Sequence, residues 1–344
     1  MQASRCLYRL CPAHAPDAGE SVRDPSRHVP PSLPPSMNAE VVMRFESFAS
    51  ATISLEYAGY VKRAAPILLL ALFWCWETWR PFFGQREGRL RHAGRNLAVA
   101  VLNTVVTGLL FGHVTVWVAG WAERNQFGLL NVLAIEGPVR FALALVLLDG
   151  WMYVWHRANH TFPLLWRFHR MHHSDRHMDV TTATRFHLGE HLGSSVLRLG
   201  LIPLLGLEVW NLVVYDTLVV AGTQFHHADI SLGRWDRWLR TVVVTPHMHK
   251  IHHSDRRDES DSNYSTILSV WDRLAHSFRM RDDPKGIVFG LKEFADPGWQ
   301  HFVGMWMTPL IDPKAETPVP PPGLTTQNEA CKAVDQGIRS RDGP

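Results

Sequence analysis

Most of the 20 histidines of this chain lie between His156 and His253, in blocks that have the spacing of metal ligands. The blocks are HRANH at 156–160, HRMHH at 169–173, RFHLGEH at 185–191, FHHAD at 225–229 and HMHKIHH at 247–253. Histidines three or four positions apart share one face of a helix, so each block can direct two or three imidazoles at one point. Neutral imidazole binds iron, zinc, copper or nickel, and one metal ion needs only a few such ligands. Convergence of ten or more histidines therefore predicts two metal ions, in a fold that brings these distant segments together.

Four apolar stretches accompany the blocks, at residues 64–83, 96–121, 141–155 and 196–225. The second contains no Asp, Glu, Lys or Arg and exceeds the roughly 20 residues that a membrane-spanning helix needs. The fourth is interrupted near Pro203 and Gly206, so its halves can form a hairpin. We predict an all-α integral membrane helical bundle with four or five membrane segments.

The arginines between the first two stretches set the expected orientation. Basic loops stay in the cytoplasm, which places the segment containing Arg86, Arg89, Arg91 and Arg95 there. The second stretch then leaves the cytoplasm and the third returns, so His156 lies on the cytoplasmic side. The histidine-rich stretches show almost no strand pattern. We expect them to be helix extensions and short helices that form a cytoplasmic histidine-rich helical cap.

The composition supports a membrane domain with polar ends. The chain is 46% hydrophobic but has a mean hydropathy of only −0.09, so its apolar residues are concentrated in segments. We expect a disordered or amphipathic segment at 1–60, a membrane domain at 61–312 and a disordered Pro-rich tail at 313–344. An alternative interpretation places the true start at Met37 or Met43.

The charge and the cysteines exclude other classes of protein. The formal charge of +3 is too small to indicate a nucleic-acid partner. The four cysteines form no CxxC pair, so the metal chemistry must rest on histidine. A dinuclear all-imidazole site beside lipid favours iron that activates dioxygen, although ligand type alone leaves zinc and copper open.

Two other functions fit parts of the pattern. His187, Glu190 and His191 match the HxxEH pattern of some zinc peptidases, with Glu190 as general base, which would make the chain a membrane zinc hydrolase. A non-catalytic metal-binding membrane transporter is the third hypothesis. Transporters place their ligands inside the spans, whereas these histidines gather beyond them.

Seven strings together resemble the fatty acid hydroxylase/sterol desaturase superfamily of membrane proteins. They are DGWMYVWHRANH, WRFHRMHHSD, RFHLGEH, FHHADI, TPHMHKIHHSD, DSNYS and LSVWDRL, in order between Asp149 and Phe278. The resemblance implies a di-iron enzyme that uses O₂ to hydroxylate or desaturate a lipid, such as a sterol or fatty acyl chain. It also implies that a reductase or small redox protein delivers the electrons.

The resemblance implies a ligand set as well. The matching positions are His156, His160, His169, His172, His173, His227, His249, His252 and His253, with His187 as a further ligand. The roles of His177, His191, His226 and His247 stay open. Asp149 would orient a ligand or form part of the active-site roof, and Asp175, Asp229 and Asp255 are further candidates for orienting histidines. Asn263, Tyr264 and the Trp271–Arg273 element would pack around the site without taking part in the chemistry.

Overall fold

The computed structural model describes Tyr60, residues 64–84 and residues 88–311, all within one compact unit, Leu55–Pro344. Every regular element in this part of the chain is helical. Pairing of extended backbone is limited there to two isolated bridges, Val243 with Leu268 and Ser254 with Phe289. The predicted all-α fold class is thus confirmed for the described residues. The expectations for segment 1–60, apart from Tyr60, and for tail 313–344 concern residues outside this range.

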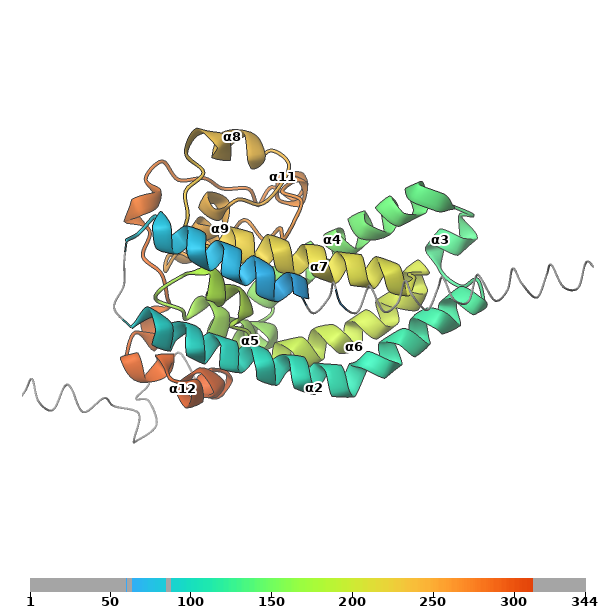
Figure 1. Cartoon of the computed structure of the whole chain (residues 1–344), viewed down its shortest axis with the longest axis horizontal. Helices are drawn as coiled ribbons and strands as arrows, with labels where there is room; N and C mark the ends of the chain where they lie inside the picture. Colours follow the sequence, from blue (N-terminus) through green and yellow to red (C-terminus); the bar gives the residue numbers. More distant parts are fainter. Residues whose placement is uncertain (1–59, 61–63, 85–87, 312–344) are drawn as a thin grey trace, which may run out of the picture. The chain divides into compact units, whose positions relative to one another are not determined.

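Long helices form the apolar part of the unit (Figure 1). They are a helix at Ala64–Trp79, α2 at Arg89–Arg124, α4 at Gly137–Thr161, α6 at Leu188–Leu205 and α7 at Val209–His227, with the short α3 at Leu129–Val132. Helix α2 packs along α6, and α7 packs against α4. Leu148, Ile202 and Leu212 belong to the buried apolar core between α4, α6 and α7.

Two of the described segments are long and apolar enough to cross a membrane. They are Arg89–Val132 and Gly137–Thr161. Ala64–Trp79 is apolar but shorter, and the fourth predicted stretch is divided between α6 and α7. These features support membrane association. The number of crossings and the cytoplasmic side stay predictions.

The predicted hairpin in the fourth stretch is present. Gly206 follows α6 with φ of +73°, the left-handed conformation that glycine adopts most readily. The turn before α3 packs directly on it, because a Cβ on Gly128 would lie 2.3 Å from the Gly206 nitrogen. Helix α7 therefore runs back alongside the bundle and ends at His227 (Figure 1).

Short helices gather at the end of the bundle where α7 ends (Figure 1). They are α5 at Pro163–His173, α8 at Asp236–Leu239, α9 at Pro246–His252, α10 at Arg257–Ser260, α11 at Val270–Leu274 and α12 at Phe302–Met307. Short 3₁₀ turns lie between them, at Val180–Thr184, Gly233–Trp235, Pro284–Gly286, Lys292–Phe294, Pro297–Gln300 and Thr308–Leu310. Prolines fix where the histidine helices begin, since Pro163 and Pro246 occupy the first turn of α5 and α9.

Candidate metal centre

Nine of the predicted ligands come together in two groups at the junction of the long and short helices. Group A contains His156, His160, His169, His173 and His252. Group B contains His172, His227, His249 and His253. Within each group, one ring nitrogen per histidine lies within 4.8 Å of all the others. Neither group contains a carboxylate or a thiol, so each offers imidazole donors alone.

The two HxxHH helices divide their histidines between the groups. On α5, His169 and His173 lie one turn apart and belong to group A, whereas His172 belongs to group B. On α9, His252 belongs to group A and His249 to group B, and His253, which directly follows α9, also belongs to group B. Helix α4 supplies only group A and α7 only group B.

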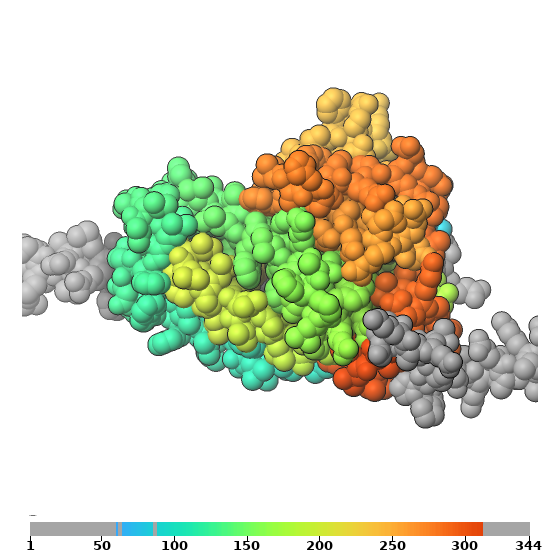
Figure 2. All heavy atoms as spheres, turned by 180° about the vertical axis from the view of Figure 1, so that it is seen from behind, coloured from blue at the N-terminus to red at the C-terminus, as the bar shows by residue number. Residues whose placement is uncertain are grey.

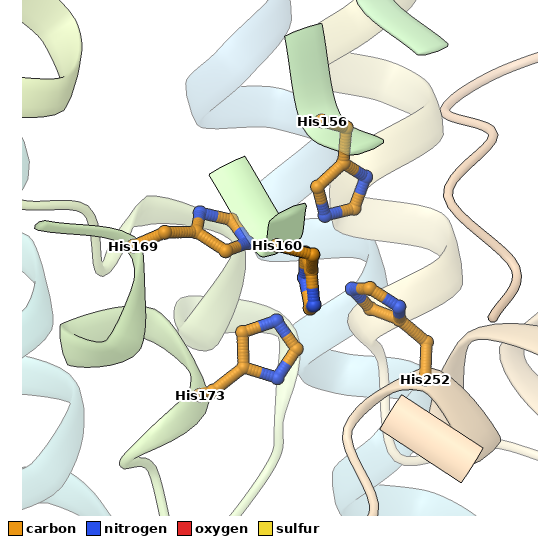
Figure 3. A group of neighbouring side chains, drawn as sticks. All are labelled: His156, His160, His169, His173 and His252. Carbon is orange, nitrogen blue, oxygen red and sulfur yellow. The ribbon is translucent and has the colours of Figure 1, made fainter. Parts of the chain in front are cut away.

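The rings of group A face one another (Figure 3). The ring centroids of His156 and His252 lie 4.6 Å apart, and those of His160 and His173 lie 4.7 Å apart. The buried Nε2 atoms of His156, His160, His169 and His252, and both ring nitrogens of His173, have no hydrogen-bond partner. Buried nitrogens without a partner are costly, so this arrangement fits a cation between the rings.

Group B is tighter. Nε2 of His227 lies 3.1 Å from Nε2 of His172, 3.2 Å from Nε2 of His253 and 3.1 Å from Nε2 of His249. Four Nε2 atoms thus meet around one point. Hydrogen bonds cannot satisfy all four at once, whereas a metal ion can accept all four lone pairs.

The other ring nitrogen of several ligands is held by the backbone. Nδ1 of His156 lies 2.7 Å from the Tyr264 carbonyl, Nδ1 of His252 lies 2.7 Å from the Ser262 carbonyl, and Nδ1 of His227 lies 2.7 Å from the Thr223 carbonyl. A carbonyl only accepts, so each Nδ1 carries the proton and each Nε2 keeps a free lone pair. This is the tautomer that a metal site requires.

Carboxylates orient two further ligands. Nδ1 of His169 lies 3.0 Å from Oε1 of Glu190, and both side chains are buried. Nδ1 of His160 lies 3.2 Å from Oδ1 of Asp261, whose side chain is 34% exposed. Neither role was predicted from the sequence. The only signal was the position of Glu190 in the RFHLGEH block, three residues after His187.

Burial keeps the imidazoles neutral. It lowers the pKa of His227 and of His252 to about 3. Burial, followed by the repulsion of neighbouring imidazoles, also lowers the pKa of His172, His249 and His253 well below the usual value. A neutral ring is the ligating form, so these histidines can bind a metal without first losing a proton.

The C-terminal signature residues position the carbonyls that hold the ligands. Asn263 is fully buried, with φ of +53°, and donates to the carbonyls of Met248 (3.0 Å) and Arg279 (2.8 Å). Asp272 accepts from the Tyr264 nitrogen at 2.8 Å. Asp149 accepts from Trp271 Nε1 at 2.8 Å and from the Leu268 nitrogen at 3.0 Å. Asp149 therefore ties α4 to this segment, and no hydrogen bond joins it to any of the nine rings.

The structure does not bring His187 into either group. Its Nδ1 accepts a hydrogen bond from the Gly189 nitrogen at 2.9 Å and so caps α6, and its ring packs on Phe168 and Trp306. His191 packs on Phe186. Since Glu190 is bonded to His169, the described residues show no zinc site built from the HxxEH block.

The other three histidines whose roles the sequence left open also lie outside the groups. The ring centroid of His226 is 3.9 Å from that of His249, so His226 packs against a group B ligand with its ring tilted by 40°. His247 lies 3.6 Å from Asp236, and the ring of His177 packs edge-on against His92.

The three acidic candidates bind other partners. Asp175 pairs with His92, whose two ring nitrogens bridge Asp175 at 2.9 Å and Asp179 at 3.0 Å. Asp229 accepts from the Phe83 nitrogen, and Asp255 lies 4.0 Å from Lys292. No sequence pattern predicted the role of His92.

Comparison with known proteins agrees with the resemblance of the histidine blocks. The sequence model of the fatty acid hydroxylase family matches residues 141–277. Alkylglycerol monooxygenase from Homo sapiens is 25% identical over 268 residues, which cover 74% of this chain and 56% of that protein. Ornithine lipid hydroxylase OlsE from Rhizobium tropici is 28% identical over 249 residues, which cover 67% of this chain and 69% of that protein.

A third relative, very-long-chain aldehyde decarbonylase GL1-7 from Oryza sativa subsp. japonica, is 24% identical over 172 residues, or 46% of this chain and 25% of that protein. The chain thus spans little more than half the length of the human relative. No solved structure matches it. The predicted relationship to the superfamily is confirmed.

Proposed function

We propose that this chain, which resembles the fatty acid hydroxylase family over residues 141–277, is a membrane-bound di-iron oxidoreductase that uses O₂ to hydroxylate or desaturate a C–H bond of a lipid. The observation that supports this best is the pair of imidazole groups, in which group A has buried ring nitrogens without a partner and group B has four Nε2 atoms that meet around one point. Nine imidazole donors in two adjacent groups exceed what a single structural metal ion requires.

One iron would be held by group A and the other by group B. The donor set fits, because imidazole suits iron and both groups lack the thiolates and carboxylates of other common sites. Bound there, the iron pair would supply the reduction of O₂ that the oxidation of an inert C–H bond requires.

The residues of the chain would hold this centre in place. Tyr264, Ser262 and Thr223 fix three rings through backbone carbonyls, and Glu190 and Asp261 fix two more through carboxylates. Bonds of this kind set the ring orientation and the basicity of the ligating nitrogen. The burial of both groups keeps bulk water away from the reacting centre.

The substrate class follows from the setting of the site. Two apolar helices long enough to span a membrane lead to the metal groups, and relatives named for alkylglycerol and ornithine lipid oxidation share the family. We propose a lipid substrate such as a sterol or fatty acyl chain. Hydroxylation consumes one O₂, two electrons and two protons and yields the alcohol and water, so a reductase or small redox protein must supply the electrons.

We place the active site on the cytoplasmic side of a multi-pass protein. Arg89, Arg91 and Arg95 lie at the end of α2 that is next to the histidine-rich cap, which agrees with the bias of basic residues toward the cytoplasm. The transporter hypothesis is less well supported, because the groups lie where α4 and α7 end, not midway along the apolar helices.

Metal analysis of histidine variants tests the proposal. His252→Ala removes a group A ligand and His249→Ala removes a group B ligand, while His247→Ala changes a neighbour on the same helix that belongs to neither group. In detergent-purified protein we expect about two irons per chain for the parent and for His247→Ala, and about one for each of the other two variants. An O₂-dependent absorbance change should accompany the iron of the parent. Stoichiometric zinc with no response to O₂, or equal iron in all variants, would contradict the proposal.

A further inference from the structure

Large apolar side chains are exposed on one face of the cap, around α8. Trp235 is 60% exposed, Trp238 64%, Leu239 42% and Val242 61%. Leu274 on the neighbouring α11 is 68% exposed. Figure 2 shows the α8 segment, in gold, protruding from the surface. Exposing two large apolar side chains, three positions apart, would be unfavourable if this part of the cap contacted only water.

These side chains belong to one continuous face, because backbone hydrogen bonds join the two segments that carry them. The Ser269 nitrogen donates to the Val242 carbonyl at 3.0 Å, and the Val244 nitrogen donates to the Ile267 carbonyl at 2.9 Å. The Arg273 guanidinium binds the Arg240 carbonyl at 2.7 Å. We call residues 233–242 and 270–274 the α8–α11 face.

The charge on this face is positive. The guanidinium groups of Arg234 and Arg237 lie 5.3 Å and 5.1 Å from the rings of Trp235 and Trp238. The acidic residue of the segment, Asp236, is buried and paired with Arg240 at 3.1 Å. Tryptophan with arginine is the combination typical of a lipid headgroup region.

The attachment to α4 sets the depth of the face. Asp149 lies at the middle of α4 and binds the Leu268 nitrogen and Trp271 Nε1, and the Trp271 ring packs on Gly150. Asp149 precedes the ligand His156 by seven residues, which is about 10 Å along a helix. The start of α11 is therefore level with the apolar half of α4 and not with the metal groups.

We propose that the α8–α11 face docks on the anionic headgroup region of the bilayer that α4 enters. Trp235, Trp238 and Leu274 insert below the phosphates, and Arg234 and Arg237 bind them. The inference rests on the proposed membrane position of α4. A soluble protein partner would account for the exposed tryptophans, but not for the attachment of this face, through Leu268 and Trp271, to the middle of an apolar helix.

Spin labels in lipid nanodiscs test this docking. In a chain without its native cysteines, one label is placed by Trp238→Cys, a second by Leu274→Cys, and an aqueous control by Lys292→Cys, where the side chain is 83% exposed. Val146→Cys, on α4 and 38% exposed, reports the membrane position of that helix. We expect labels at 238, 274 and 146 to collide more with O₂ than with a water-soluble nickel complex, and the label at 292 to show the reverse.

The outcomes separate the two proposals. A lipid-exposed label at 146 together with water-exposed labels at 238 and 274 would overturn the docking alone. A water-exposed label at 146 would overturn the membrane position of α4 and the docking with it. The double variant Arg234→Gln, Arg237→Gln should make the label at 238 shallower when phosphatidylglycerol is present, and an equal depth in anionic and zwitterionic lipid would contradict the role of the arginines.

Discussion

Glu190→Gln distinguishes the oxygenase from the hydrolase by metal affinity. Both Glu190 and His169 are buried, and their atoms lie 3.0 Å apart. A hydrogen bond to a charged group contributes about 1.5–3 kcal/mol, which is roughly a 10- to 100-fold change in an equilibrium constant. Gln keeps the shape and an acceptor oxygen but not the charge. We therefore expect iron affinity, measured by competition with a chelator, to fall about tenfold, and Glu190→Ala to lower it by up to about 100-fold.

Asp261→Asn is the matched control, because Asp261 makes the same kind of contact with His160 at 3.2 Å while 34% exposed. Solvent reduces such contributions to about 1 kcal/mol or less, so the loss of affinity should stay below about tenfold. Unchanged affinity in Glu190→Ala, or a larger loss in Asp261→Asn, would refute this account of how His169 is oriented. A zinc hydrolase with Glu190 as general base predicts the opposite pattern, in which metal is retained and hydrolysis is lost.

Three further predictions concern stability and assembly. Burial holds the pKa of His227 and His252 at about 3 against an unfolded value of 6.5, so their neutral forms stabilise the metal-free fold above pH 6.5, and this stability is lost as the pH falls toward 3. At pH 5 the free energy of unfolding should be lower by about 2 kcal/mol for each histidine. Thermal unfolding of the metal-free protein at pH 8 and pH 5 tests this, and equal melting temperatures would contradict it. Gly206→Ala should destabilise the fold by at least about 1–2 kcal/mol, because Gly206 has a positive φ and an added Cβ would lie 2.9 Å from Asn131 and Phe127. Gly200→Ala is the control: an added Cβ there would have no atom within 4 Å, so this variant should be neutral or stabilising in the same unfolding assay. Thr245→Val removes the side-chain cap at the start of α9 and should weaken metal binding in both groups, because α9 carries ligands of both. Loss of metal from one group alone would show that α9 does not position both sets of ligands together.

The sequence predicted which histidines come together, but not how they divide between the two groups. Helical spacing indicated that His169, His172 and His173 could point at one centre. In the structure, however, the one-turn pair His169 and His173 faces group A, and His172 faces group B. The angle between a helix and its neighbours determines this division, and a single sequence does not encode that angle locally.

The residues that orient the ligands were the least predictable. Glu190 lies 21 positions from His169, and Asp261 lies 101 positions from His160, so no local pattern links them. For His187, the sequence predicted a ligand, and the structure shows a helix cap instead. Its position before α6 suits an N-cap as well as a ligand, and only the packing of its ring on Phe168 and Trp306 distinguishes the two.

The opposite partition of the two HxxHH helices has a consequence for assembly. Helix α5 gives two ligands to group A and one to group B. The segment of α9 with the adjoining His253 gives one ligand to group A and two to group B. Each group therefore needs both helices, while α4 and α7 complete only one group each. Because α5 and the α9 segment each supply ligands to both groups, a displacement of either one alters both groups at once. Two metal ions bound in this way would hold the ends of α4 and α7 together, which makes metal binding part of the folding of the cap.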